Sequence, residues 1–304
     1  MSTLVIPDVH QNHKRAQAII DRAGAGRNIV FTGDFFDSYG DDPSQAEDTA
    51  IWLKEKILPN PNITVLIGNH DVSYLWNHNS NYWCSGFTKE KSATINAVLT
   101  PEDKAKFKLF HITEGFVFSH AGLTNKLWKL MVQRYTDNPP SPTTLDFFAE
   151  VLGAYAKEAV KDSDAGHAHF LLTAGWDRGG RQQYGGITWV DWNSFSPING
   201  INQIVGHSRR NVPWILTQRE GGSISNKSII EHYEHQALVA QANATSRVPI
   251  KVKNLSTTYD LDTGLNHYAI VSNGSVEIFD YINNINLRDV ANYAIPENPL
   301  NNLG

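Results

Sequence analysis

The stretch that decides the fold class is Ile29-Val30-Phe31-Thr32-Gly33-Asp34-Phe35-Phe36-Asp37. It begins with a short apolar run that is typical of a buried strand. The run ends at a glycine, which lets the backbone turn sharply, and two carboxylates follow, three residues apart. Ligands of α/β sheets collect at the carboxyl ends of the strands. The stretch therefore predicts a strand that delivers Asp34 and Asp37 to a binding site.

Four further apolar runs end in polar residues of the same kind. Residues 4–6 lead to Asp8 and His10, residues 63–67 to Asn69 and His70, residues 116–118 to His120, and residues 201–205 to His207. Because each run has the length of a buried strand, we expect five strand ends to direct these side chains to one place.

The segments around these runs complete the predicted fold. Helical patterns cover residues 16–20, 44–58, 144–161 and 228–241, and a hairpin is expected at residues 268–281 around Asn273-Gly274. We predict the α/β class, with a central β-sandwich flanked by helices. No stretch has the composition of a flexible linker. We therefore expect residues 1–304 to form a single domain, with cap or insert segments near 72–110 and 125–195.

The composition excludes several classes of protein. With 41% hydrophobic and 19% charged residues in a chain of 304, a substantial core can be buried. The net charge of −5, without a dense Lys/Arg run, argues against general nucleic-acid binding. No stretch approaches the roughly 18 apolar residues of a membrane span, and the N-terminus lacks the pattern of a signal peptide. The single cysteine, Cys84, favours a reducing compartment, so we expect a cytoplasmic protein.

The residue types at the five strand ends suit divalent metal ions. Carboxylates and imidazoles bind Mn²⁺, Zn²⁺ and Fe ions, and one carboxylate can bridge two of them. Two ions about 3.5–4 Å apart can hold a water between them, lower its pKa and neutralise phosphate oxygens. Each motif alone is a common polar turn. The prediction of a metal site therefore depends on their shared placement at strand ends.

Taken together, the motifs resemble the calcineurin-like metallophosphoesterase superfamily, whose shared pattern is D-x-H, G-D-x-x-D, G-N-H-[D/E] and two later His motifs. The chain carries them as Asp8-Val9-His10, Gly33-Asp34-Phe35-Phe36-Asp37, Gly68-Asn69-His70-Asp71, Ser119-His120-Ala121-Gly122 and Gly206-His207. More narrowly, the chain resembles the phosphoprotein phosphatase branch, with its phage and bacterial members, and the related diadenosine tetraphosphate hydrolases. The resemblance implies a four-layer fold and, for a phage-encoded member, expression in a bacterial host.

The resemblance also implies a ligand set for two divalent ions. It consists of Asp8, His10, Asp34, Asn69, His120 and His207, with Asp34 bridging both ions. Mn²⁺ is the first choice for these ions, and Zn²⁺, Fe or Ni²⁺ are alternatives.

The remaining implied roles concern the phosphate and the leaving group. His70 would act as the general acid on the leaving oxygen, oriented by Asp37. Asn69 would contact the phosphate, and so would Arg178, whose segment Trp176-Asp177-Arg178 resembles the W-x-R segment of the phage and bacterial phosphatases. A guanidinium can grip a phosphoryl group with two parallel hydrogen bonds.

The implied activity is hydrolysis of a phosphate monoester by a water that bridges the two ions, on a phosphoprotein or a nucleotide. Serine/threonine phosphatases of this branch usually carry an Arg directly after the second Asp of G-D-x-x-D, where this chain has Ser38. Arg181, Arg209 or Arg210 would have to replace that arginine. A dinucleoside polyphosphate hydrolase is therefore kept as the alternative. A nuclease ranks third, because no second His follows Gly206-His207.

The segment 77–86 follows directly on the His70 motif and is aromatic, with Tyr82 and Trp83 before Cys84. It suits one wall of a substrate cleft and a packed cap equally well. Cys84 has no basic neighbour in the sequence that would mark a reactive thiol, so we assign it a structural role.

Overall fold

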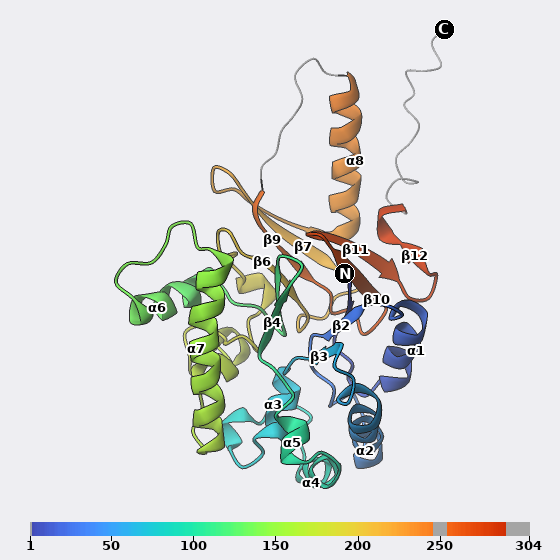
Figure 1. Ribbon diagram of the computed structural model, residues 1–304, viewed down its shortest axis with the longest axis vertical. Coiled ribbons are helices and arrows are strands. Elements are labelled where there is room, and N and C mark those ends of the chain that lie inside the picture. The colour runs from blue at the N-terminus through green and yellow to red at the C-terminus, as the bar shows by residue number, and fades with distance from the viewer. Residues whose placement is uncertain (1, 246–253, 290–304) are drawn as a thin grey trace.

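The computed structural model describes residues 2–245 and 254–289, which form two six-stranded sheets with helices on either side (Figure 1). The first sheet has the order β12-β11-β10-β1-β2-β3, and the second has the order β4-β5-β6-β9-β7-β8. In the first sheet the strands are β1 (Thr3–Ile6), β2 (Asn28–Phe31), β3 (Ile63–Val65), β10 (His267–Ser272), β11 (Ser275–Asp280) and β12 (Ile285–Asn286). In the second they are β4 (Phe110–Thr113), β5 (Phe116–Ser119), β6 (Asn202–Val205), β7 (Trp214–Arg219), β8 (Ile224–Ser228) and β9 (Asn254–Asp260).

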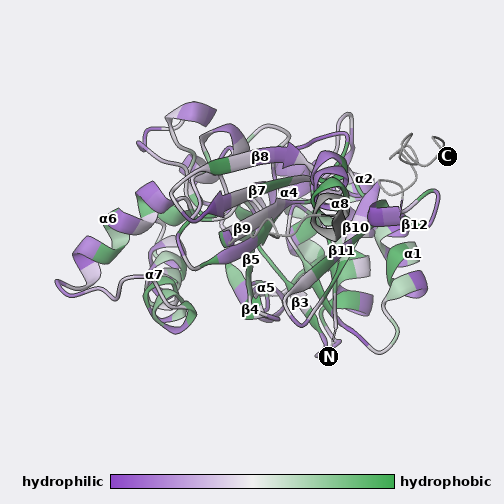
Figure 2. Ribbon diagram, turned by 90° about the horizontal axis from the view of Figure 1, so that it is seen from above, coloured by the Kyte–Doolittle hydropathy of each residue, from purple (hydrophilic) through white to green (hydrophobic). Residues whose placement is uncertain are grey.

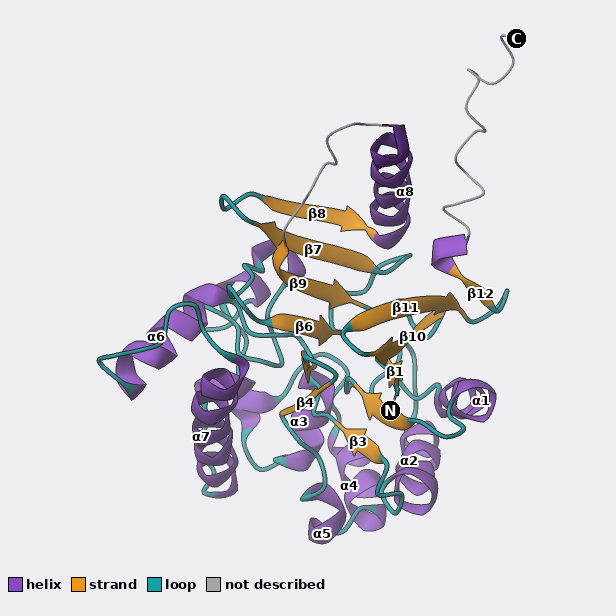
Figure 3. Cartoon of the chain, turned by 45° about the horizontal axis from the view of Figure 1, so that its top comes forward, coloured by secondary structure: helices purple, strands orange, loops and turns teal. Residues whose placement is uncertain are grey.

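The helices and short helical turns lie between and around these strands. They are α1 (His13–Ala23), α2 (Pro43–Trp52), η1 (Leu53–Ile57), α3 (Asn69–Leu75), η2 (Ser80–Tyr82), α4 (Lys89–Val98), α5 (Pro101–Lys104), α6 (Asn125–Tyr135), α7 (Leu145–Asp164), η3 (Phe170–Leu172), η4 (Trp176–Arg178), η5 (Trp192–Ser194) and α8 (Ile229–Thr245). Figures 1 and 3 show α1 and α2 on the opposite side of the strands from α6 and α7. In the described part of the chain, no helix is long and apolar enough to cross a membrane.

Strand β1 joins two hydrophobic cores because successive side chains of a strand point to opposite faces. Leu4 and Ile6 pack in one core with Ile19 of α1, whereas Val5 packs in the other with Phe118 of the second sheet. Residues of the two sheets therefore share one apolar core, and the helices cover another. The predicted α/β class, with a β-sandwich flanked by helices, is confirmed.

Helix α7 shows how a flanking helix attaches to the strands. Hydrophobic and hydrophilic residues both occur along its ribbon (Figure 2), and its buried apolar residues are Phe148, Val151, Leu152 and Ala159. This spacing of three, one and seven residues puts them on one face of a helix. The helix covers the predicted segment 144–161 and extends to Asp164.

The predicted helix 44–58 is divided in two. Its N-cap is Asp42, whose side chain accepts hydrogen bonds from the backbone N–H groups of Ser44 and Gln45, so that α2 begins at Pro43. After Trp52 the chain continues as the π-helical turn η1, which ends before Pro59 as the sequence predicts. We have no physical account of why the last turn is a π-helix.

The strands that deliver the polar motifs are parallel within each sheet. In the first sheet, Ile6 of β1 lies beside Phe31 of β2, and Phe31 lies beside Val65 of β3. In the second, β5 and β6 are parallel, with Phe118 beside Ile204. The carboxyl ends of each set therefore meet at one edge of their sheet. The site is built from the edges of both sheets.

Candidate active site

The predicted metal ligands come together at the carboxyl ends of β1, β2, β3, β5 and β6. Asp8 follows β1, Asp34 follows β2, Asn69 opens α3 after β3, and His120 follows β5 directly. All four side chains are buried, with at most 2% of their surface exposed. His10 and His207 are half-buried beside them. Five strand ends thus meet at one site, as the sequence predicts.

One group of ligand atoms surrounds a single point. His120 Nε2 lies 2.9 Å from Asn69 Oδ1, 3.1 Å from His207 Nδ1 and 3.4 Å from Asp34 Oδ2. His207 Nδ1 also lies 2.8 Å from Asn69 Oδ1. The Nδ1–H of His120 donates to the carbonyl of Thr32 at 3.0 Å, which leaves Nε2 of the neutral ring with a lone pair. At these distances the facing nitrogen and oxygen atoms need either protons on the imidazoles or a metal cation between them.

A second group shares Asp34 with the first. Asp8, His10 and Asp34 offer ligand atoms within 4.8 Å of one another, and so do Asp34, His120 and His207. His10 Nδ1 donates to the carbonyl of Asp37 at 2.7 Å, so its Nε2 is free to act as a ligand, 3.8 Å from Asp34 Oδ2. The two groups therefore have one carboxylate in common, which is the arrangement a bridging ligand requires.

The electrostatics of the two groups fit bound cations. The pKa of Asp8 is raised to about 7, mainly by burial and next by the nearby carboxylate of Asp262. Burial also acts to raise the pKa of Asp34, but His120 and His70 lower it more, so the net direction is downward. Two buried carboxylates side by side are costly without positive charge. Divalent ions bound by these oxygen and nitrogen atoms would supply it, so the residues present fit a metal centre.

Two glycines make room for the carboxylates. A Cβ on Gly68 would lie 2.0 Å from Asp34 Oδ1, and a Cβ on Gly206 would lie 2.0 Å from Asp8 Oδ1. Any side chain at either position would displace a candidate ligand. The G-N-H and G-H motifs therefore require glycine for a steric reason: the backbone at these positions lies directly against a carboxylate of the site.

Four of the predicted site residues have left-handed backbone conformations. The φ angles are 43° at His10, 50° at Asp34, 62° at Asp37 and 73° at His207. Such angles are uncommon for residues other than glycine and cluster at functional sites, where the surrounding structure holds them. Each of the four residues lies in the loop that follows a strand of the site.

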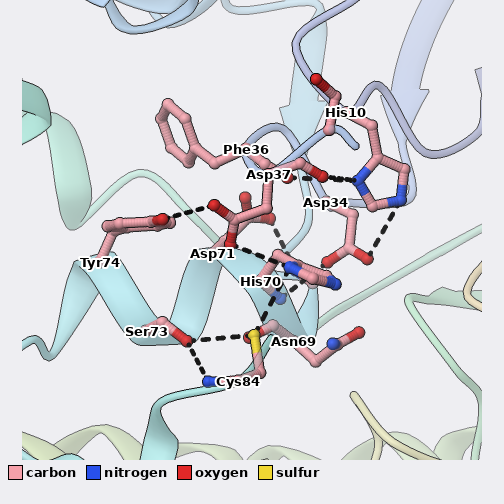
Figure 4. Close-up of polar contacts among 12 residues, drawn as sticks. His10, Asp34, Phe36, Asp37, Asn69, His70, Asp71, Ser73, Tyr74 and Cys84 are labelled. Atoms are coloured by element: carbon pink, nitrogen blue, oxygen red, sulfur yellow. Dashed lines mark hydrogen bonds and ion pairs between the residues drawn. The ribbon is translucent and has the colours of Figure 1, made fainter. Parts of the chain in front are cut away.

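His70 stands beside the two ligand groups and is held by Asp37 (Figure 4). Its Nδ1–H donates to Asp37 Oδ2 at 2.9 Å, and its backbone N–H donates to Asp34 Oδ1 at 2.9 Å. Burial lowers the pKa of His70, but the carboxylates of Asp34 and Asp37 raise it more, so the pKa lies well above the usual value. The raised pKa favours the protonated ring, which lies beside that of His10, with ring centroids 5.3 Å apart.

A buried network around Asp37 could not be predicted from the sequence. Its Oδ1 accepts hydrogen bonds from Tyr74 Oη and from Lys91 Nζ, the latter at 2.6 Å. Lys91, which is 3% exposed, also pairs with Asp41 at 3.0 Å. Lys91 is 54 residues from Asp37 in the chain, and no local motif marks either Lys91 or Tyr74.

Asp71 joins two of the loops that carry candidate ligands. Its Oδ1 accepts the backbone N–H of Phe35 and its Oδ2 that of Gly68, both at 2.8 Å. The fully buried carboxylate therefore ties the loop after β2 to the loop after β3. This contact sets the positions of Asp34 and Asn69 relative to each other.

A groove of about 650 Å³ adjoins the site and holds two of the arginines considered from the sequence. Arg178 and Arg181 line it, together with Trp83, Cys84 and Trp189 among others. The Nε of Arg178 pairs with Asp191 at 2.7 Å, and its side chain is about one third exposed.

The other two arginines have contacts of their own. Arg209 lies against Gly264, where a Cβ would come within 2.4 Å of its Nη2. Arg210 packs over the ring of Trp214 and donates to Asn193. Of the four arginines, Arg178 and Arg181 are thus the two that line this groove.

The comparison with known families agrees with this geometry. The family model described as calcineurin-like phosphoesterase matches residues 1–209. The chain belongs to this family. Its members are phosphate-ester hydrolases that depend on a divalent metal centre, and the matched residues include all six candidate ligands. No curated protein matches the sequence.

Among solved structures similar to this chain, a protein-tyrosine phosphatase supports the fold. The cold-active protein-tyrosine phosphatase of the psychrophile Shewanella sp. superposes with a TM-score of 0.51 at 11% identity, over 92% of this chain and 78% of that chain. The metallophosphoesterase from Sphaerobacter thermophilus gives 0.38 at 15% identity, over 91% and 87%. A serine/threonine phosphatase from Saccharomyces cerevisiae gives 0.40 at 12% identity, over 92% and 80%. The Shewanella protein supports the fold assignment, and at this identity it says nothing of substrate.

Proposed function

We propose that this phosphoesterase is a phosphatase of phosphate monoesters, with phosphoserine- and phosphothreonine-containing proteins as its substrate class. The observation that carries the proposal is the position of Asp34 in both ligand groups, with His70 beside them on the Asp37 carboxylate. Paired metal sites next to a protonated imidazole suit the hydrolysis of a phosphate ester whose leaving group needs a proton.

Two ions would be held by different sets of side chains. Asp8, His10 and Asp34 would hold the first, and Asp34, Asn69, His120 and His207 would hold the second. When bound, two divalent ions supply a water of lowered pKa as nucleophile and neutralise phosphate oxygens. We favour Mn²⁺, with Zn²⁺, Fe or Ni²⁺ as alternatives for the same oxygen and nitrogen ligands.

His70 would serve the leaving group. Asp37 accepts a hydrogen bond from Nδ1–H and so fixes the orientation of the ring. The other nitrogen, Nε2, is then the atom that can donate to a departing alkoxide. Tyr74 and Lys91 keep the Asp37 carboxylate in place, because both donate to the oxygen that His70 does not use.

The phosphate would be gripped by side chains at the edge of the groove. We assign Asn69 and Arg178 to this role, with Arg181 as the candidate for the arginine that Ser38 replaces. Arg178 and Arg181 line one groove, and its walls fall within segments 72–110 and 125–195, which we propose as caps over the site. Substrate preference would then be decided by these segments.

The same groove favours a second candidate, a dinucleoside polyphosphate hydrolase. Trp83 is 41% exposed and stacks on Phe87 with ring centroids 4.6 Å apart, and Trp189 lines the groove near it. Exposed aromatic rings beside two arginines suit a substrate with a base and further phosphates.

A substrate panel separates these candidates. The protein is saturated with Mn²⁺ at neutral pH and assayed on a phosphoserine peptide, diadenosine tetraphosphate, p-nitrophenyl phosphate and bis-p-nitrophenyl phosphate. The proposal requires both monoesters to be cleaved, with the phosphopeptide preferred over the dinucleotide. Faster cleavage of diadenosine tetraphosphate would favour the second candidate. Faster cleavage of the diester than of p-nitrophenyl phosphate would favour a nuclease.

A further inference from the structure

A third set of metal-binding side chains lies beside His70, outside the two ligand groups that share Asp34. Asp37, His70 and Cys84 offer ligand atoms within 4.8 Å of one another. His70 Nδ1 lies 2.9 Å from Asp37 Oδ2 and 3.5 Å from Cys84 Sγ. Figure 4 shows the imidazole between the carboxylate and the sulfur. The sequence places Cys84 fourteen residues from His70, and the loop after η2 brings them together.

We propose that Asp37, His70 and Cys84 form an inhibitory site for Zn²⁺ and other thiophilic ions, distinct from the centre that supports hydrolysis. Zinc binds thiolate at about 2.3 Å and imidazole or carboxylate at about 2.0–2.2 Å in tetrahedral geometry, which puts neighbouring ligand atoms about 3.3–3.6 Å apart. The 3.5 Å between His70 Nδ1 and Cys84 Sγ lies in this range, and the 2.9 Å between Nδ1 and Asp37 Oδ2 would lengthen by about 0.4 Å on binding. A thiolate also selects Zn²⁺ over Mn²⁺, which the oxygen-rich groups accept.

The charges around this site fit a divalent ion. Asp37 has one oxygen committed to Tyr74 and Lys91, so Oδ2 remains for a metal. Lys91 pairs with Asp37 and Asp41 together, which leaves one uncompensated carboxylate. With Cys84 as thiolate, two negative charges remain to balance Zn²⁺.

The site can be reached from solvent on two sides. Cys84 is half-buried and lines the groove of about 650 Å³ that also contains Arg178. Asp37 and His70 line a second cavity, of about 520 Å³, with Lys91. An ion can therefore approach the three side chains without any rearrangement of the core.

Zinc at this site would disable His70. Coordination through Nδ1 releases to solvent the proton that His70 shares with Asp37 and the proton of the Cys84 thiol. The ring keeps its proton on Nε2, but a neutral imidazole bound to zinc would be a far weaker acid than the imidazolium, so it would protonate a leaving group poorly. The inhibition, unlike zinc binding itself, rests on the proposed role of His70 in hydrolysis.

A simpler explanation is that Cys84 only packs against the acid pair. Its Sγ lies 3.4 Å from Ser73 Oγ, and its backbone N–H donates to the same oxygen, so it has a place in the loop without a metal. Under that explanation, excess zinc would inhibit only by replacing ions in the other two groups. Cys84 would then be irrelevant to inhibition.

Metal binding at this site can be tested without an enzyme assay. The Mn²⁺-saturated protein is titrated with Cd²⁺, which reports thiolate ligation by an ultraviolet charge-transfer band. Cys84 is the single cysteine, so only this site can give the band. We expect one equivalent of Cd²⁺ to saturate it, Zn²⁺ to abolish it, Cys84→Ser to lack it, and His70→Asn to weaken cadmium binding at least about tenfold. A missing band, or one that is unchanged in His70→Asn, would overturn the proposed site.

Inhibition is tested on the same Mn²⁺-saturated protein. We expect Cys84→Ser to raise the half-inhibitory Zn²⁺ concentration at least about tenfold relative to wild type, each compared with its own uninhibited rate. Ser85→Ala is the matched control, since Ser85 is an exposed neighbour on the same groove, and its zinc response should equal that of wild type. Equal inhibition of Cys84→Ser and wild type would overturn the inhibitory role. If no phosphate ester is hydrolysed at all, the proposed function fails, and the cadmium band still decides the metal site.

Discussion

His70 and Asp37 are joined by a hydrogen bond of 2.9 Å between Nδ1 and Oδ2, and the other oxygen of the same carboxylate accepts from Tyr74 and Lys91. The carboxylate therefore has no freedom to turn away from the imidazole. This arrangement holds the ring of His70 beside the candidate ligands of the two proposed ions without making it one of those ligands. It separates the residues that would bind metal from the residue that would protonate the leaving group.

Replacement of His70 by Asn should affect substrates according to their leaving groups. We expect His70→Asn to keep both ions and to lose about 10²–10⁴-fold in kcat on a phosphoserine-like ester, because an alkoxide needs a proton to leave. The loss on p-nitrophenyl phosphate should be much smaller, because p-nitrophenolate leaves readily without one. Parallel kinetics on the two substrates, with metal content, measure this.

The control for this prediction is His167→Asn, since His167 is exposed on a loop away from the described network. It should match wild type on both substrates. Equal losses of His70→Asn on the two esters would mean that the ring only supports its loop. Loss of a metal ion in His70→Asn would also mean that the ring only supports its loop, because the displaced loop would move the candidate ligand Asn69.

Lys91 should matter for stability and for rate. Lys91→Met leaves the buried carboxylates of Asp37 and Asp41 without their cation, which we expect to lower the free energy of unfolding by about 3 kcal/mol. It should also lower kcat, because Asp37 would no longer be held on His70. Urea unfolding and steady-state kinetics measure the two effects. Lys89→Met, an exposed position at the start of the same helix, should change neither. Unchanged unfolding in Lys91→Met would show that the pair contributes nothing.

The protein stripped of metal should become less stable as the pH rises. Burial lowers the pKa of His120, but Asp34 and Asp8 raise it more, to about 9, against the ordinary pKa of 6.5 in the unfolded chain. A raised pKa stabilises the fold fully below pH 6.5, and this stabilisation is lost as the pH rises toward 9. We expect a slope of order 1 kcal/mol per pH unit over this window.

Thermal unfolding with a chelator at pH 6.5, 7.5 and 9 measures this slope. His120→Asn should flatten it, since the titrating group is removed. Added Mn²⁺ should raise Tm more at pH 9 than at pH 6.5, because a metal needs the neutral imidazole that high pH supplies. A Tm that rises with pH in the chelated protein would contradict the cationic state of His120.

The candidate ligands at the strand ends were predictable from the sequence, because each follows a short buried run closely. Asp34 and His207 are examples: one apolar run and one glycine locate each of them. Parallel pairing then brings the runs to common edges, and this follows from general rules for α/β proteins. What could not be foreseen is the order of the strands, and therefore how the five strand ends divide between the two sheets.

Strand β9 shows why the rest of the fold was missed. Its sequence, Asn254-Leu255-Ser256-Thr257-Thr258-Tyr259-Asp260, is mostly polar, yet it pairs with both β6 and β7 in the middle of the second sheet. Ser256, Thr258 and Asp260 are buried there. Hydrophobic periodicity carries no signal for such a strand.

Cys84 shows what the sequence could not predict about the site. Its sequence neighbours contain nothing that marks a functional thiol, and the structural role assigned to it followed from those neighbours alone. The residue that matters is His70, 3.5 Å away from Sγ in the folded chain. Contacts of this kind arise from how loops pack and have no local pattern.

Asp34 decides the central claim, because both ligand groups depend on its carboxylate. The measurement is the number of Mn²⁺ ions per chain at saturation, together with the rate on p-nitrophenyl phosphate, for wild type, Asp34→Asn and Asp42→Asn. Asp42 is exposed and caps α2, a role that Asn can also fill, so Asp42→Asn is the matched control. We predict two ions and full activity for wild type and the control, and neither tight binding of two ions nor measurable activity for Asp34→Asn. One ion per chain in saturated wild type, or an active Asp34→Asn with two ions, would contradict the account.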